Sequence, residues 1–198
     1  MNRFMRQAAA LLAAGLFSLA AAAQEGQPCP RPGTQQELPQ TLGPGFERAG
    51  THSFEAEMPG GGCSVRYKHP SGMWADVYIY QAKLGTIEDK PRDERLLSEF
   101  QTAMAGIRYS WEERQQAKVS DLAGRYEKRG QQDVEVMVGT ASIDSPKHGA
   151  LSTYLQVWSG GGSIWKLRTT YPAADKAVSD SAVVALGNAL VDLSREKP

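Results

Sequence analysis

The strongest constraint on the fold is a predicted β-hairpin between Leu151 and Tyr171. Apolar and polar residues alternate through 151–158, a Ser-Gly-Gly-Gly-Ser turn follows at 159–163, and the alternation resumes through 164–171. Period-two alternation on both sides of a glycine turn predicts a hairpin. Large apolar side chains stand at both parities of the first strand: Leu151, Leu155 and Val157 at one, Tyr154 and Trp158 at the other. Both faces of such a strand need cover, so we expect this hairpin at the centre of a sheet.

A second hairpin is predicted between Cys63 and Tyr80. Alternation through 63–68 is followed by a turn at 69–72 with proline at its second position, and then by a strand over 74–80. This second strand again has apolar side chains on both of its faces. Regular structure is expected to begin near Phe46, with a first strand where apolar and polar residues alternate over 53–58, ended by Pro59 and three glycines.

Two further strands and two helices are predicted in the rest of the chain. A mostly polar segment over 119–128 is expected at a sheet edge, and the β-branched repeat at Val134, Val136 and Val138 predicts its partner. Apolar residues at helical spacing predict amphipathic helices over about 92–114 and 173–194. Asp93 and Glu94 are acids where a helix N-terminus favours them, and Tyr171-Pro172 precedes the second helix.

These elements define a single α+β domain over residues 45–198. We expect a mainly antiparallel, twisted sheet of about six or seven strands with two long helices, in the order β-ββ-α-ββ-ββ-α. This order, and the aromatic strand that passes through Tyr171-Pro172 into a terminal helix, resembles the PsbP-like fold over roughly Phe46 to Leu193. That family is named for a photosystem II extrinsic protein, and a Ran-binding nuclear-import factor and small exported bacterial proteins share its fold. The resemblance implies a binding or assembly module rather than an enzyme, and assigns no binding residue.

The first 23 residues have the pattern of a secretory signal peptide. Arg3 and Arg6 precede an apolar, alanine-rich stretch that is short for a membrane span, and three small residues end at Ala23, where we expect cleavage. No lipobox precedes Cys29. Removal of the two arginines leaves 20 basic against 22 acidic residues, a formal charge of −2. We therefore predict a periplasmic or secreted protein with no membrane span after cleavage and no nucleic-acid partner, because nucleic acid usually requires a basic patch.

A proline-rich arm over 24–44 is expected to be extended and irregular. The chain has two cysteines, Cys29 and Cys63, and in an exported protein such a pair favours a disulfide. The bond would stabilise the fold by about 4 kcal/mol in the chain-entropy model and would hold the arm on the domain. A redox or nucleophilic cysteine is the alternative, but the sequence has no Cys-x-x-Cys motif to favour it.

No catalytic or metal-binding constellation stands out in the sequence. His52, His69 and His148 form neither a His-x-x-x-His pair nor a cluster with cysteine, so no metal and no cofactor are predicted. The local grouping of Asp144, Ser145 and His148 could rarely reach triad geometry within one loop. The glycine runs at 60–62 and 160–162 are expected to be turns rather than phosphate loops, and Glu112-Glu113 a solvated helix end.

Aromatic residues on predicted strands are the remaining functional signal. If a helix leaves part of one sheet face open, some of them form a binding surface for a protein, peptide or glycan; the alternative is that they pack under the two helices. The candidates are Trp158, Trp165, Trp74, Tyr78 and Tyr80, and the two tryptophans beside the central turn are expected to be the most exposed. The leading hypothesis is an exported, non-catalytic binding or assembly module in the cell envelope. A small envelope hydrolase and an inhibitor or immunity-type protein are the alternatives.

Overall fold

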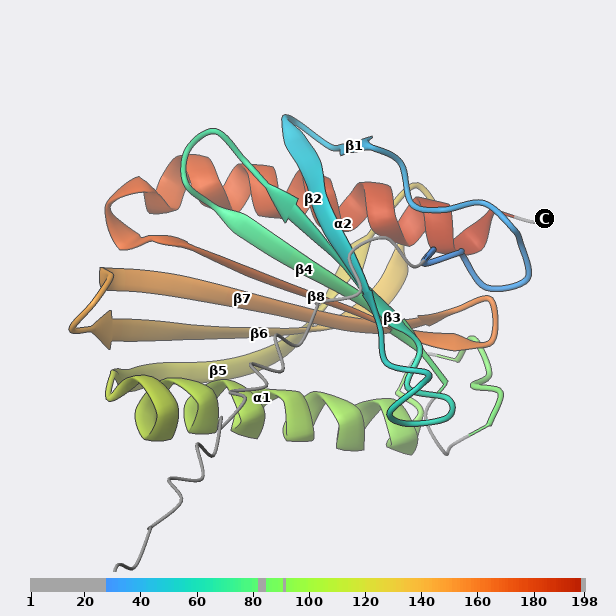
Figure 1. Cartoon of the computed structure of the whole chain (residues 1–198), viewed down its shortest axis with the longest axis horizontal. Helices are drawn as coiled ribbons and strands as arrows, with labels where there is room; N and C mark the ends of the chain where they lie inside the picture. The colour runs from blue at the N-terminus through green and yellow to red at the C-terminus, as the bar shows by residue number, and fades with distance from the viewer. Residues whose placement is uncertain (1–27, 82–84, 91, 197–198) are drawn as a thin grey trace, which may run out of the picture.

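The computed structural model describes residues 28–81, 85–90 and 92–196 (Figure 1). The predicted signal peptide and the first residues of the arm lie outside these ranges. The strands are β1 (Thr41–Leu42), β2 (Phe46–Ser53), β3 (Cys63–Lys68), β4 (Trp74–Tyr80), β5 (Lys118–Arg129), β6 (Val134–Ser145), β7 (Gly149–Gly160) and β8 (Ser163–Pro172). The helices are α1 (Glu94–Gln115) and α2 (Lys176–Arg195), with a short 3-10 turn (Ala173–Asp175) before α2. The prediction of an α+β fold with two long helices is confirmed.

All eight strands form one antiparallel sheet in the order β1-β2-β3-β4-β8-β7-β6-β5. The central hairpin β7–β8 is inside the sheet as predicted, and β8 joins the two halves by pairing with β4, where Asp76 lies opposite Arg168. The expected six or seven strands become eight because β1 is added. This strand has only two residues, too few for a periodic signal, and it is formed by pairing with Phe46 and Glu47.

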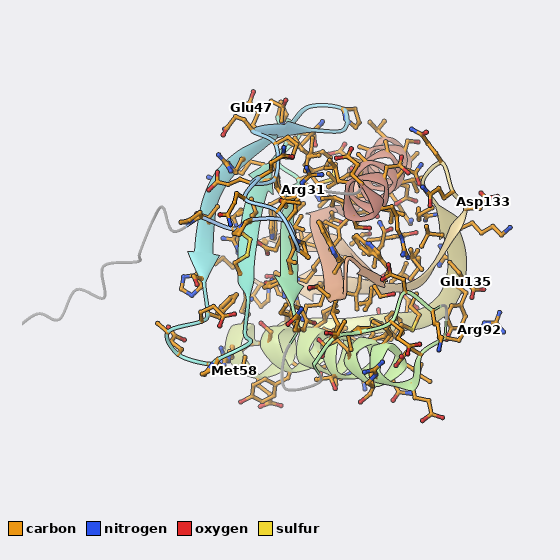
Figure 2. The ribbon with its side chains drawn as sticks, turned by 90° about the vertical axis from the view of Figure 1, so that its right-hand side faces the viewer. Arg31, Glu47, Met58, Arg92, Asp133 and Glu135 are labelled. Carbon is orange, nitrogen blue, oxygen red and sulfur yellow. A yellow bond between two sulfur atoms is a disulfide. The ribbon has the colours of Figure 1, made fainter. Side chains whose placement is uncertain are left out.

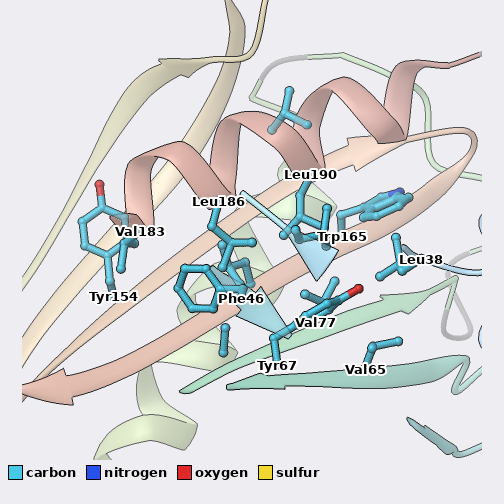
Figure 3. Packing of buried hydrophobic residues seen from close by; sticks show 14 of the residues in the cluster. Leu38, Phe46, Val65, Tyr67, Val77, Tyr154, Trp165, Val183, Leu186 and Leu190 are labelled. Atoms are coloured by element: carbon cyan, nitrogen blue, oxygen red, sulfur yellow. The ribbon is translucent and has the colours of Figure 1, made fainter. Parts of the chain in front are cut away.

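Helix α2 lies on the concave face of the sheet and covers the larger core. Its residues Val183, Leu186 and Leu190 pack on apolar side chains from both halves of the sheet; Figure 3 shows Phe46, Val65, Tyr67, Val77 and Trp165 among them. Both ends of the sheet curve round to reach the helix. On one side, a Cβ at Gly43 would lie 3.3 Å from the Leu186 Cα; on the other, the Gly130 N–H donates to the Asn188 side chain at 3.1 Å.

The segment Ala173–Arg195 is long and apolar enough to cross a membrane by length and composition, a test that buried core helices also meet. The contacts of α2 with the sheet are those of a core helix.

Helix α1 lies on the opposite face of the sheet, as the end-on view in Figure 2 shows. It starts at the N-cap Asp93, whose carboxylate accepts the Arg95 backbone N–H at 2.8 Å. Its buried residues pack mainly on β5, β6 and β7; they are Leu96, Met104, Ile107 and Trp111. The half of this face that β3 and β4 form is less covered, since Trp74 and Tyr80 of β4 pack only at the edge of this core.

The first strand is displaced from its predicted position. Residues 54–58 form a turn, and the strand is β2, which ends at Ser53. The Glu55 carboxylate accepts the backbone N–H groups of Gly60 and Gly62 at 2.9 and 2.7 Å, and this local bonding closes the loop. Side-chain bonds of this kind favour a turn over an extended strand, which the alternation at 53–58 could not reveal.

Candidate binding surface

The two tryptophans predicted to be most exposed are buried, which corrects that expectation. Trp158 is 1% exposed and Trp165 is 0% exposed, and their rings stack at 5.9 Å beneath α2. The indole N–H of Trp158 donates to Ser194 Oγ at 3.0 Å, and that of Trp165 to the Gly160 carbonyl at 3.0 Å. The curvature of the sheet carries the tip of the hairpin under the C-terminal turn of α2, so both rings belong to the core.

The other three candidates, Trp74, Tyr78 and Tyr80, remain half-buried on the α1 side of β4. They alternate with Ala75, Val77 and Ile79, which point into the core under α2. Trp74 and Tyr80 pack at the edge of the core under α1, so the three aromatic residues stand where the cover of α1 ends. This position agrees with the idea of a partly open face, but it moves the candidate surface from the hairpin tip to β4.

Cross-strand register organises this open half-face, defined here as the α1-side residues of β3, β4 and β8. Its rows run across the three strands: Lys68, Trp74 and Thr170; Arg66, Asp76 and Arg168; Ser64, Tyr78 and Lys166. At the outer edge, Gly50 of β2 pairs with Arg66, and nothing lies within 4 Å of where its Cβ would be. At this edge the β2 residue beside the middle row therefore has no side chain to cover the row, because that residue is a glycine.

Two arginines share one carboxylate in the middle row. Asp76 is 3% exposed; its Oδ1 accepts from Arg66 Nε at 2.7 Å and its Oδ2 from Arg168 Nη2 at 3.1 Å. The Arg66 side chain is 55% exposed and that of Arg168 29%. The hydrogen bond that Arg66 donates to Asp76 raises the pKa of Arg66. The buried acid therefore fixes two charged guanidinium groups, and the face presents the positive charge outward.

The next row combines a cation with aromatic rings. Lys166 Nζ lies 5.0 Å from the Tyr78 ring centroid and 4.9 Å from that of Tyr80, within cation–π range, and bonds Glu99 of α1 at 3.1 Å. Tyr80 also donates to Glu99. Burial raises the pKa of Tyr78 and that of Tyr80, so both hydroxyls stay neutral at physiological pH. Phe54 stacks on Tyr78 from the other side, with ring centroids 6.4 Å apart.

A groove of about 270 Å³ separates α1 from the open half-face. Its floor includes Tyr78, Lys166 and Arg168. Its helical wall has three small residues, Thr102, Ala103 and Gly106, between Glu99 and Ile107. Nothing lies within 4 Å of where a Cβ on Gly106 would be. Glycine inside a helix is destabilising by about 1 kcal/mol relative to alanine, and here its effect is to leave the groove wide.

The histidines do not assemble a catalytic group. His148 is exposed, and Ser145 Oγ accepts its backbone N–H rather than facing its ring. The His69 ring contacts Ser71 Oγ at 2.8 Å within one turn, and His52 packs on Phe54. Within the described ranges no histidine contacts both a serine and a carboxylate, and no group of three or more His, Cys, Asp or Glu residues is placed to hold a metal ion.

The sequence did not single out Arg66, Asp76, Lys166 or Arg168. Each stands at the polar parity of its strand, a position that ordinarily faces solvent, and only the pairing of β4 with β8 brings them together. The opposed charges of Arg66 and Asp76 across the predicted second hairpin were the one detectable signal.

Comparison of the chain with protein-family models and with curated protein sequences finds no match. The functional class of this protein therefore rests on the geometry of the open half-face, and the PsbP-like resemblance stays a prediction.

Proposed function

We propose that this protein is an exported, non-catalytic binding module that holds a partner of the cell envelope on the open half-face and in its groove. The observation that carries the proposal is the incomplete cover of the sheet. One face is filled by α2, whereas on the other α1 leaves half-buried aromatic rings beside fixed cations. Aromatic and arginine side chains are the residues most enriched at binding hot spots.

Export is supported by the cysteine pair. Cys29 and Cys63 form a disulfide, as predicted, with the two sulfurs joined across a sequence separation of 34 residues. Disulfides persist in oxidising compartments, so this bond agrees with a periplasmic or secreted location. The signal-peptide pattern before Ala23 supports the same location from the sequence.

The alternatives receive less support from the geometry. A hydrolase needs a nucleophile, a base and an orienting group in mutual contact, and the His69–Ser71 pair of the described residues has no carboxylate beside it. An inhibitor or immunity-type protein would use a surface of the same kind, and identification of the captured partner would distinguish it from an assembly module.

Filling the groove without disturbing the core tests the proposal. Gly106→Leu places a branched side chain into the space beside Tyr78 and Lys166, so we expect it to abolish capture of a partner from envelope extract. Ala105→Leu adds the same side chain to the neighbouring exposed position of α1, outside the residues that line the groove, and serves as the matched control. A partner that is retained by both variants would refute the open half-face as the binding surface.

A further inference from the structure

The two arginines of the middle row have surplus hydrogen-bond donors. Both oxygens of Asp76 are bonded to arginines, and Glu99 Oε1 accepts from Tyr80 and Lys166. The remaining N–H groups of the two guanidiniums, at Nη1 and Nη2 of Arg66 and at Nε and Nη1 of Arg168, bond to no residue in the described ranges. A pair of guanidinium groups with donors left over is complementary to an acceptor.

The net charge of the middle row is small. Arg66 and Arg168 carry two positive charges and Asp76 carries one negative charge, which leaves +1, and Lys166 in the next row is paired with Glu99. A monovalent carboxylate neutralises this excess, whereas a phosphate dianion would overcompensate it. Arginine forks bind carboxylates bidentately, and because Asp76 already fixes both guanidiniums, little rotamer freedom remains to be lost on binding.

We propose that Arg66 and Arg168 together seat a carboxylate from an acidic peptide segment of the partner, laid extended along the groove beside β8. This inference rests on the proposed function and names the chemistry of its ligand. Tyr78 and Lys166 occupy the next row, two residues along the strands, at a spacing of about 6.6 Å. Side chains two apart in an extended peptide have the same spacing, so an acidic residue on the arginines places the next inward side chain against Tyr78 and Phe54. The segment has an acidic residue followed, two positions later, by an apolar one.

The test measures fluorescence anisotropy with a fluorescein-labelled octapeptide that repeats glutamate, serine, leucine and serine. A second peptide with glutamine for glutamate has the same shape without the charge. The full exported protein should bind the glutamate peptide at least about tenfold more tightly than the glutamine peptide, the ratio expected for charge-assisted bonds. Arg66→Gln and Arg168→Gln should each remove that preference. Arg125→Gln, which removes an exposed arginine of β5 that pairs with Glu127, should leave the preference intact.

Loss of either arginine leaves the buried Asp76 with one partner and could unfold the protein. A double variant that keeps both charges separates loss of binding from loss of folding. Arg66→Lys combined with Arg168→Lys keeps both charges but removes the forked donors, so it should fold and still bind about tenfold more weakly. Equal binding of the two peptides, or an equal loss in Arg125→Gln, would overturn the proposal. Competition by inorganic phosphate at lower concentration than acetate would also overturn it, because the seat would then prefer a dianion.

The two proposals fail in different ways. If the glutamate peptide is not bound but an envelope partner is captured and lost on Gly106→Leu, the carboxylate seat is wrong and the binding module stands. If Gly106→Leu retains the partner, the proposed function fails whatever the peptide does.

Discussion

At the scale of single residues, burial decides which aromatic side chains can act. Val77 and Tyr78 are neighbours on β4, yet Val77 is in the core under α2 and Tyr78 lines the groove. Trp158 and Trp165 are core residues, and replacing either with alanine should cost about 3–5 kcal/mol of folding free energy. Loss of binding in such a variant would report unfolding, so the surface is better probed at Arg66, Gly106 and Arg168.

Gly62 is expected to tolerate no side chain. It has a φ of 66°, and a Cβ there would lie 1.9 Å from the Ile79 carbonyl oxygen, which is part of the sheet and cannot move away. Gly62→Ala should therefore cost more than about 3 kcal/mol in urea denaturation. Gly72→Ala is the control, because Gly72 has a φ of 85° with nothing within 4 Å, and should cost only about 1 kcal/mol. Equal losses of stability in the two variants would mean that the positive φ, and not the clash with the Ile79 carbonyl, is the reason for glycine at position 62.

Asp93 should make helix α1 sensitive to acid. The hydrogen bond from the Arg95 side chain lowers the pKa of Asp93 to about 2, whereas in the unfolded chain it is about 3.9. A lowered pKa stabilises the fold above the unfolded value, and that contribution is lost as the pH falls from about 4 to about 2. Asp93→Asn keeps a capping oxygen but does not titrate. Its stability deficit relative to the wild type, measured by thermal unfolding, should shrink over this pH window; a constant deficit would exclude the linkage.

At the scale of elements, the N-terminal arm is a packed part of the domain. The arm is irregular, as predicted, but Leu38 is 2% exposed and Tyr67 donates to the Pro39 carbonyl at 2.8 Å. Arg31 reaches the other end of the chain, with its guanidinium bonded to Glu196 and to the Leu193 carbonyl at the end of α2. The arm therefore closes one side of the α2 core.

Loss of the disulfide should loosen that side first. Cys29→Ser with Cys63→Ser removes a cross-link that stabilises by about 4 kcal/mol in the chain-entropy model. Hydrogen exchange should accelerate over 28–42 and the last turn of α2, while α1 and β5 keep their protection because they pack on the opposite face. Uniform acceleration over both faces would show that the arm is coupled to the whole domain.

Elements with long periodic patterns were predictable, whereas those made by local bonding were not. The α1 stripe, the acids at its start, the β5 edge and the central hairpin follow from spacing alone. The turn over 54–58 depends on the Glu55 carboxylate, and β1 depends on pairing with β2. A carboxylate that bonds a glycine five residues away leaves no periodic trace in the sequence.

At the scale of the whole molecule, several buried tyrosines should limit stability in alkali. Burial raises the pKa of Tyr67, Tyr78, Tyr80, Tyr154 and Tyr171. In the unfolded chain they ionise near pH 10, so their contribution is present below that pH and is lost as the pH rises above it. The free energy of unfolding should fall steeply above about pH 10, and Tyr67→Phe should make the fall shallower. A flat profile to pH 12 would contradict this linkage.

The candidate site itself required the three-dimensional pairing. The sequence placed Trp74, Tyr78 and Tyr80 on one strand, but Arg168 lies 92 residues beyond Asp76, and nothing local shows that β8 pairs with β4. The accessibility of each aromatic residue depends on how far α1 covers the sheet. The extent of that cover is set by the curvature of the sheet. The sequence showed which residues of each strand share one face of the sheet. It did not show which strands pair with one another.

The pairing of β4 with β8 also determines when the full sheet can form as the chain emerges from a channel. The N-terminal half of the sheet ends at β4 and gains its next strand only from residues 163–172, after α1 and three further strands. In a polypeptide threaded through a translocation channel from its N-terminus, β4 has β3 as its partner on one side but gains β8 on the other only after residues 163–172 have emerged. The same pairing of β4 with β8 builds the Arg66–Asp76–Arg168 row. If the chain is exported as we propose, this row forms only after residues 163–172 have crossed the membrane, and a partner that needs it would meet it only there.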